Sequence, residues 1–133
     1  MKNYPALCEM CFQDLYRAAV LCTGDEGIAS RLVERTCVRG VQACDGLDDV
    51  RLVKIELTGI LFRLCIEQRC AYEPGQRGYC EQMANLDKYE RAMIIFRHCS
   101  GLKAAEFAMA IGMTAEYASQ LLTQVRQKVY MRG

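Results

Sequence analysis

Residues 102–129 carry two apolar patterns of helical period, separated by a tight turn. Gly112 can adopt the positive φ that ends the first helix, and Thr114 can cap the second by accepting a hydrogen bond from a backbone N–H near Tyr117. Ala108 is small enough for the close approach of two steeply crossing helices. One stripe of the second helix should be buried: Ala118, Leu122, Val125 and Val129. The pattern predicts a helix-turn-helix, and its alternative is a pair of packed helices within an all-α domain.

The rest of the second predicted helix is polar and free to meet a partner. In a DNA-binding role, amide and hydroxyl side chains would bond to base edges or phosphates, and Lys103, Arg126 and Lys128 would hold phosphates. The predicted DNA-contacting residues are Lys103, Thr114, Glu116, Tyr117, Ser119, Gln120, Thr123, Gln124, Arg126 and Lys128. Leu121 interrupts this polar set, and it either touches a thymine methyl group or packs on a protein partner.

Four further helices are predicted, over residues 6–22, 28–44, 48–71 and 87–99. The second of them has an expected inward stripe: Ala29, Val33, Cys37, Val41 and Cys44. Its outer face places three arginines at four-residue steps: Arg31, Arg35 and Arg39. This arginine row is either a solvated helix face or, together with Leu121, a partner-binding surface.

The predicted fold is all-α, with three helices in residues 1–71, a linker at 72–85 and three helices in 86–133. The linker is expected because Pro74-Gly75 and Gly78 oppose regular structure. Residues 1–85 hold ten Lys/Arg and twelve Asp/Glu, a net charge of −2, whereas the remaining residues hold seven and four, a net charge of +3. The positive excess accompanies the predicted DNA-binding segment, as attraction to phosphates requires.

Nine cysteines invite a metal or disulfide interpretation. Only Cys8 and Cys11 have ligand-like spacing, and no second pair matches them. Most of the cysteines fall on apolar positions of predicted helices, where a reduced thiol behaves as a small hydrophobic group. Buried thiols are therefore expected, with metal binding and redox sensing as the alternatives, and no metal or cofactor is assigned.

Other function classes receive little support. No secretory leader opens the chain, and the apolar stretch 57–66 is too short for a bilayer and contains Arg63, so a cytoplasmic protein without membrane contact is expected. The sole histidine, His98, adjoins Cys99, but adjacent helix positions point away from each other. No paired carboxylates or glycine-rich phosphate loop stand at useful spacing, so the chain is not expected to be an enzyme.

The C-terminal segment resembles the promoter-binding domain of bacterial RNA polymerase sigma factors, in particular the extracytoplasmic-function group. The matching positions are Leu86, Arg91, Met93 to Phe96, Gly101-Leu102, Glu106-Phe107-Ala108 and Ile111-Gly112-Met113-Thr114. A weaker match covers residues 12–40, which are similar to the opening of the family's polymerase-binding domain. Arg31 stands there where the family has an acidic residue, and Ser119, Leu121 and Gln124 stand where it commonly presents Lys or Arg.

The resemblance implies a transcription initiation or regulation protein without catalytic chemistry of its own. Its C-terminal helices would bind double-stranded promoter DNA, and its N-terminal helices would bind the RNA polymerase core. An anti-sigma protein or a second copy of the chain is a further partner that the resemblance allows. The alternative function is that of a degenerate sigma relative, a dimerising or regulatory module that binds protein without strong DNA binding.

Overall fold

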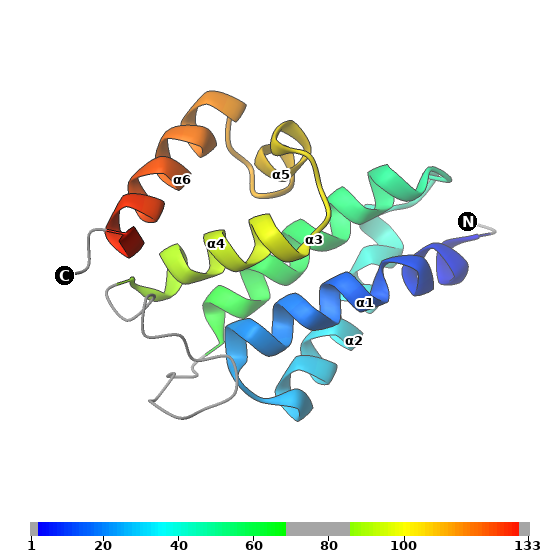
Figure 1. Ribbon diagram of the computed structural model, residues 1–133. Coiled ribbons are helices and arrows are strands. Elements are labelled where there is room, and N and C mark those ends of the chain that lie inside the picture. Colours follow the sequence, from blue (N-terminus) through cyan, green and yellow to red (C-terminus); the bar gives the residue numbers. More distant parts are fainter. Residues whose placement is uncertain (1–2, 69–85, 131–133) are drawn as a thin grey trace.

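The computed structural model describes residues 3–68 and 86–130 (Figure 1). Within these ranges the chain is all-α, with six helices and no strand, as predicted. The helices are α1 (Tyr4–Thr23), α2 (Glu26–Ala43), α3 (Val50–Glu67), α4 (Lys88–Cys99), α5 (Ala104–Ala110) and α6 (Ala115–Tyr130). The predicted linker 72–85 lies outside the described residues.

Helices α1, α2 and α3 pack against one another. Tyr4 ties the start of α1 to α2, because its hydroxyl donates a hydrogen bond of 2.5 Å to the carbonyl oxygen of Cys37. Asp25 caps α2 by accepting a 2.9 Å hydrogen bond from the backbone N–H of Ile28, and Asp49 caps α3 in the same manner. Local caps and one long-range bond thus define how these helices begin.

Helix α3 is the centre of the core and packs against α1, α2, α4 and α5. Its sequence is apolar on nearly every side, which predicts a helix that is buried all round. From Leu57 to Cys65 every side chain except Arg63 is buried. This stretch is therefore the centre of the core, which extends beyond the N-terminal helices to α4 and α5.

Helix α4 packs directly on α1 and α3, and α5 packs on α3, so the described helices share one hydrophobic core. The ring of Phe96 on α4 meets the ring of Phe62 on α3 edge to face, with the centroids 5.4 Å apart. Lys54 on α3 forms a 2.6 Å ion pair with Asp14 on α1. Figure 1 shows α3 running through the middle of the molecule, with α6 at the far side from α2. The division into two domains stays a prediction.

The prediction that Val41 of α2 lies in the core is wrong. Val41 is 57% exposed, although Ala29 and Val33, earlier in the same predicted stripe, are fully buried. Steps of four residues overshoot one helical turn by about 40° each, so a stripe with that spacing rotates away from the core. After three such steps, Val41 has left the buried face.

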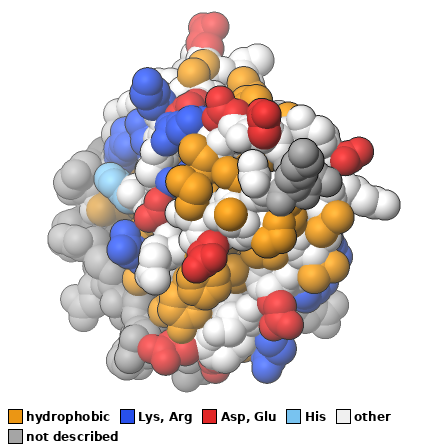
Figure 2. Space-filling view, turned by 90° about the vertical axis from the view of Figure 1, so that its right-hand side faces the viewer, with side chains coloured by type: hydrophobic (Ala, Val, Ile, Leu, Met, Phe, Trp, Pro, Cys, Tyr) orange, Lys and Arg blue, Asp and Glu red, His pale blue; other side chains and the backbone are white. Residues whose placement is uncertain are grey.

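The surface also exposes several large apolar side chains. Those most exposed include Met10, Val38, Val41 and Met109. On the face that lies to the right in Figure 1, hydrophobic side chains gather between basic and acidic ones (Figure 2). None of the helices in the described part of the chain has the length and apolar character that a bilayer crossing needs.

Candidate nucleic-acid interface

The turn between α5 and α6 has the geometry that the sequence predicts. Gly112 has a φ of 76°, in the left-handed region where a residue without Cβ is favoured. The backbone N–H of Met113 donates a 2.9 Å hydrogen bond to the carbonyl oxygen of Ala108, which closes the end of α5. The hydroxyl of Thr114 accepts a 3.1 Å hydrogen bond from the backbone N–H of Tyr117, which caps α6 as expected.

The predicted buried stripe of α6 is present. Ala118, Leu122 and Val125 are buried, and Val129 is half-buried. This stripe holds α6 against α4 and α5, which are the helices that it mainly contacts. The opposite side of α6 therefore faces away from the body of the molecule, at the upper left of Figure 1.

All ten predicted DNA-contacting residues lie at the surface. The exposed residues of this set are Lys103, Thr114, Glu116, Tyr117, Ser119, Gln120, Thr123, Gln124, Arg126 and Lys128. Two of the hydroxyls are engaged within the helix, because Thr114 caps α6 and Thr123 donates a 3.0 Å hydrogen bond to the carbonyl oxygen of Ser119. The amides of Gln120 and Gln124 project from exposed positions one helical turn apart.

Leu121 is not part of this open face. It is half-buried and packs against the hydrophobic core. On α6 it lies about 60° from the centre of the stripe formed by Ala118, Leu122 and Val125, which is close enough for partial burial. Its packing thus accounts for an apolar residue at this position without a DNA base or a protein partner.

Lys128 has a partner within the chain. Its ammonium group forms an ion pair with the carboxylate of Glu90 on α4. Burial of Glu90 raises its pKa, but hydrogen bonds from Lys128 and from the backbone N–H of Asp87 outweigh burial and leave that pKa lowered. To bind a phosphate, Lys128 would first have to give up its ion pair with Glu90. It is therefore a weaker phosphate ligand than its position in the sequence suggests.

A small hollow beside α6 is lined by a positively charged residue, Arg97, that the sequence prediction missed. Arg97 of α4 and Arg126 of α6 line this hollow of about 100 Å³, together with Ser119 and the first residues of α5 and α6. Arg97 donates a 3.0 Å hydrogen bond to the carbonyl oxygen of Leu102. Its only sequence signal is its position in the last turn of α4, six residues before Lys103. Arg97 and Arg126 together bring two positive charges to this edge of the α6 surface, where they would attract anions.

Glu106 fastens α5 to α3. Its carboxylate accepts hydrogen bonds from the guanidinium group of Arg51, one of them 3.2 Å long from Nε, and a 2.8 Å bond from the backbone N–H of Lys103. The hydrogen bonds from Arg51, followed by the one from Lys103, lower the pKa of Glu106. One carboxylate thus both caps α5 and joins it to the N-terminal helices.

We expect the contribution of Glu106 to stability to depend on pH. Because the pKa of Glu106 in the folded chain lies below its unfolded value of about 4.3, the contribution is present above that value and disappears as the pH falls through the folded pKa. In urea unfolding, Glu106→Gln should therefore be less stable than the parent chain at pH 7, and the difference should shrink below pH of about 4. Glu9→Gln, at an exposed position of α1, is the control, and a Glu106→Gln difference that stays constant with pH would contradict the role.

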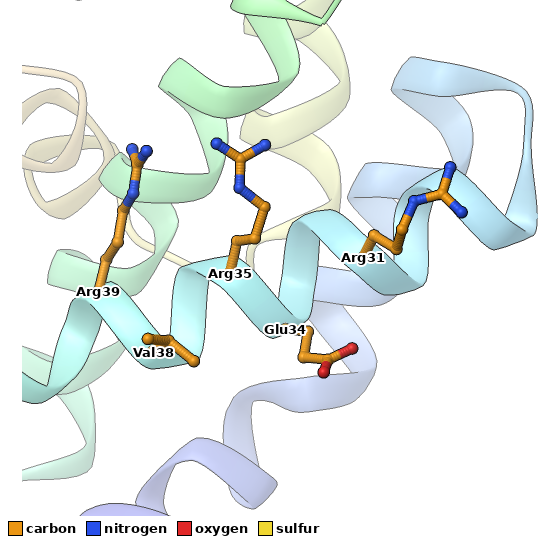
Figure 3. A pocket seen from close by; sticks show the side chains of 5 residues that line it. All are labelled: Arg31, Glu34, Arg35, Val38 and Arg39. Atoms are coloured by element: carbon orange, nitrogen blue, oxygen red, sulfur yellow. The ribbon is translucent and has the colours of Figure 1, made fainter.

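The arginine row of α2 lies at the surface, as predicted. Arg31, Arg35 and Arg39 are exposed and line an open hollow of about 520 Å³, whose other described lining residues are Glu34 and Val38. In Figure 3 the three arginines project from the same side of α2, and Glu34 and Val38 project from the other side. This surface is separate from α6, because α2 packs against α1 and α3, whereas α6 packs mainly against α4 and α5.

The cysteines within the described ranges are reduced and largely inside the protein. Cys8 and Cys11, the pair with ligand-like spacing, are both buried, and burial raises the pKa of Cys11. Burial also raises the pKa of Cys37 to about 12 and that of Cys44 to about 11. Thiols with such pKa values carry little thiolate near neutral pH and act as small apolar groups. Cys70 and Cys80 lie outside the described residues.

Residues 3–68 and 86–130 thus offer two polar surfaces, the open side of α6 and the arginine row of α2. In these ranges no group of three or more His, Cys, Asp or Glu side chains is arranged to hold a metal ion. Comparison of the chain with models of protein families, with curated proteins and with solved structures finds no match.

Proposed function

We propose that this chain is a sigma-factor-like transcription protein that binds promoter DNA through α6. The observation that carries the proposal is the open face of α6, which is exposed and polar and packs against α4 and α5 rather than against the N-terminal helices. A polar helix face of this kind can enter the major groove of DNA. The resemblance of residues 86–129 to the promoter-binding domain of sigma factors supports the same role.

In this role the residues divide into two groups. Gln120 and Gln124 are suited to base edges, because a Gln amide can donate to and accept from adenine in the major groove. Lys103, Arg126 and Arg97 are suited to phosphates, which set the position of the protein on the duplex without specifying sequence. Ser119 lies between the groups and can bond to either kind of acceptor.

The N-terminal helices would bind the RNA polymerase core. This part of the proposal rests on the resemblance of residues 12–40 to the polymerase-binding domain of sigma factors, and on the exposure of the outer face of α2. Co-elution of the full chain with purified core polymerase in gel filtration tests it. Core polymerase that elutes without the chain at low salt would reject this part of the proposal.

DNA binding should be steeply dependent on salt. With three phosphate ligands, the slope of log affinity against log salt is about −2.7, so affinity should fall roughly 40-fold between 50 and 200 mM salt. Fluorescence anisotropy with a pool of randomised duplexes measures this slope. Lys103→Ala combined with Arg126→Ala should reduce its magnitude by about 1.8, because each lost phosphate contact removes about 0.9.

Arg17→Ala is the matched control for this experiment. Arg17 is an exposed arginine on α1 whose loose contact with Asp14 spans 3.8 Å, so its loss changes the net charge without touching α6. We expect its slope to equal that of the parent chain. A chain that binds no duplex at 50 mM salt, or equal losses in the control and in the double variant, would reject DNA binding through α6.

A protein-binding module without strong DNA binding is the second candidate function. The ion pair between Lys128 and Glu90 favours it, because this pair removes one of the few cations from the DNA-facing side, and Glu116 adds a negative charge there. This module would dimerise or bind a transcription component such as an anti-sigma protein. A dimer whose sedimentation does not change with salt, in a chain that leaves duplex DNA unbound, would favour this candidate.

A further inference from the structure

The outer face of α2 carries positive charge that the described residues do not compensate. Arg31, Arg35 and Arg39 have no ion-pair partner among these residues. Like charges four residues apart repel each other on a helix, so this row is unfavourable for α2 alone. Glu34 is the nearest acidic residue in sequence, but it projects from the other side of the helix (Figure 3). The charge of the row is therefore available to a partner.

An apolar strip runs beside the arginine row. Val38 is 69% exposed and Val41 is 57% exposed, and two positions three residues apart lie on the same side of a helix. Val38 projects on the Glu34 side of α2 in Figure 3, next to the arginines rather than among them. The outer face of α2 thus offers a basic row beside a strip that holds Val38 and Val41 together with the exposed Glu34. Arg beside apolar side chains is typical of protein interfaces, in which Arg is enriched.

The spacing of these rows matches a second helix. Arginines at four-residue steps climb about 6 Å per step, and acidic residues at four-residue steps on another helix climb by the same amount. A strand would present every second side chain at about 6.6–6.8 Å, so its spacing would differ from that of the arginines by roughly 0.6–0.8 Å at each step. A nucleic acid would supply acidic groups, but its phosphates offer nothing to cover Val38 and Val41.

We infer that the outer face of α2 is a docking surface for an acidic amphipathic helix of a partner protein. Asp or Glu side chains of that helix pair with Arg31, Arg35 and Arg39, and an adjacent apolar row covers Val38 and Val41. The inference deepens the partner-binding role proposed for the N-terminal helices and does not depend on DNA binding by α6. Sigma factors have an acidic residue at the position of Arg31. The inference explains this difference, because the positive charge of Arg31 selects a partner of opposite charge.

The test uses a synthetic helical peptide with Glu at successive four-residue steps and Leu at the adjoining apolar positions. Fluorescence anisotropy should detect its binding to the full chain, with an affinity that falls as salt shortens the screening length from about 10 Å at 0.1 M to about 3 Å at 1 M. Arg31→Glu combined with Arg35→Glu should weaken binding at least tenfold. Val38→Ser should weaken it severalfold with little change in salt dependence, because it removes only apolar contact.

Two controls separate docking from general charge effects. Arg63→Glu makes the same kind of change at an exposed position of α3, and its affinity should stay within twofold of the parent chain. A second peptide with Lys in place of Glu should bind the Arg31→Glu, Arg35→Glu variant better than the parent chain, which a merely structural role of these arginines would not produce. Circular dichroism should show the parental helix content for all variants.

Three results would overturn the inference. They are equal binding of a scrambled acidic peptide, an equal loss in Arg63→Glu, and binding of single-stranded DNA that depends on the arginine row while the peptide does not bind. The assay contains neither polymerase nor duplex DNA. If the peptide fails while the chain still co-elutes with core polymerase or binds duplex DNA, the docking inference alone is rejected and the proposed function stands.

Discussion

Replacing Phe96 with Ala should lower the free energy of unfolding by about 3–5 kcal/mol, which is typical of a large aromatic side chain removed from a packed core. Phe96 is fully buried on α4, and its ring meets that of Phe62 on α3 edge to face. The substitution thus removes apolar burial and an aromatic contact at the place where the C-terminal helices meet α3. Urea unfolding followed by circular dichroism measures the effect.

The same experiment tests whether the described helices unfold as one unit. Because Phe96 belongs to a core shared by α1, α3 and α4, a single transition with an unchanged dependence on urea is expected for the variant. Phe12→Ala is the control, since Phe12 is 41% exposed and stacks on Tyr16 at the surface, and it should cost about 1 kcal/mol or less. A second transition in the Phe96→Ala curve would mean that the C-terminal helices unfold separately.

Local structure was predictable because its causes lie close together in the sequence. The turn at Gly112 and the cap at Thr114 each depend on residues within a few positions, and both have the predicted geometry. The helices follow from the period of their apolar residues, and α3 follows from a stretch that is apolar on nearly every side. The misplacement of Val41 has a local cause too, since a four-residue repeat drifts around a helix of 3.6 residues per turn.

Contacts between distant segments were not predictable from the same patterns. Arg51 and Glu106 are 55 residues apart in the chain, and neither carries a sequence signal that names the other. Arg97 joins the candidate interface only because the end of α4 lies beside α6. Lys128 is drawn to Glu90 for the same reason. The charge available to a ligand at the α6 surface therefore depends on tertiary packing, which single-sequence periodicity does not encode.

Gly59 is a further residue whose contact with a distant segment the sequence does not reveal, and its substitution should also lower the free energy of unfolding strongly. A Cβ atom built on Gly59 of α3 would lie less than 3.0 Å from the carbonyl oxygen of Ala110, at the end of α5. This oxygen belongs to the backbone, so it cannot turn away as a flexible side chain would, and α5 as a whole must move. Overpacking of this kind costs typically 1–3 kcal/mol, and we expect about 3 kcal/mol for the β-branched side chain of Gly59→Val.

The sign of the change in the free energy of unfolding for Gly59→Ala tests whether α5 lies against Gly59. Inside a helix, Ala is about 1 kcal/mol more favourable than Gly, so the substitution would stabilise α3 if nothing lay beside it. We expect the opposite, a loss in urea unfolding that grows from Gly59→Ala to Gly59→Val. Ser30→Val, on the exposed side of α2, measures the cost of a β-branched residue in a helix and should stay below about 1 kcal/mol.

The displacement of α5 should also reach the α6 surface. Lys103 directly precedes α5, and α5 leads through the Gly112 turn into α6, so a shift of α5 changes the spacing between Lys103 and Arg126. Cations that no longer match the phosphate positions lose their contacts, and the salt slope of duplex binding should become shallower in Gly59→Val, even at temperatures where the variant remains folded. A stabilised Gly59→Ala, with unchanged DNA binding in Gly59→Val, would show that α3 and α5 do not approach this closely in solution.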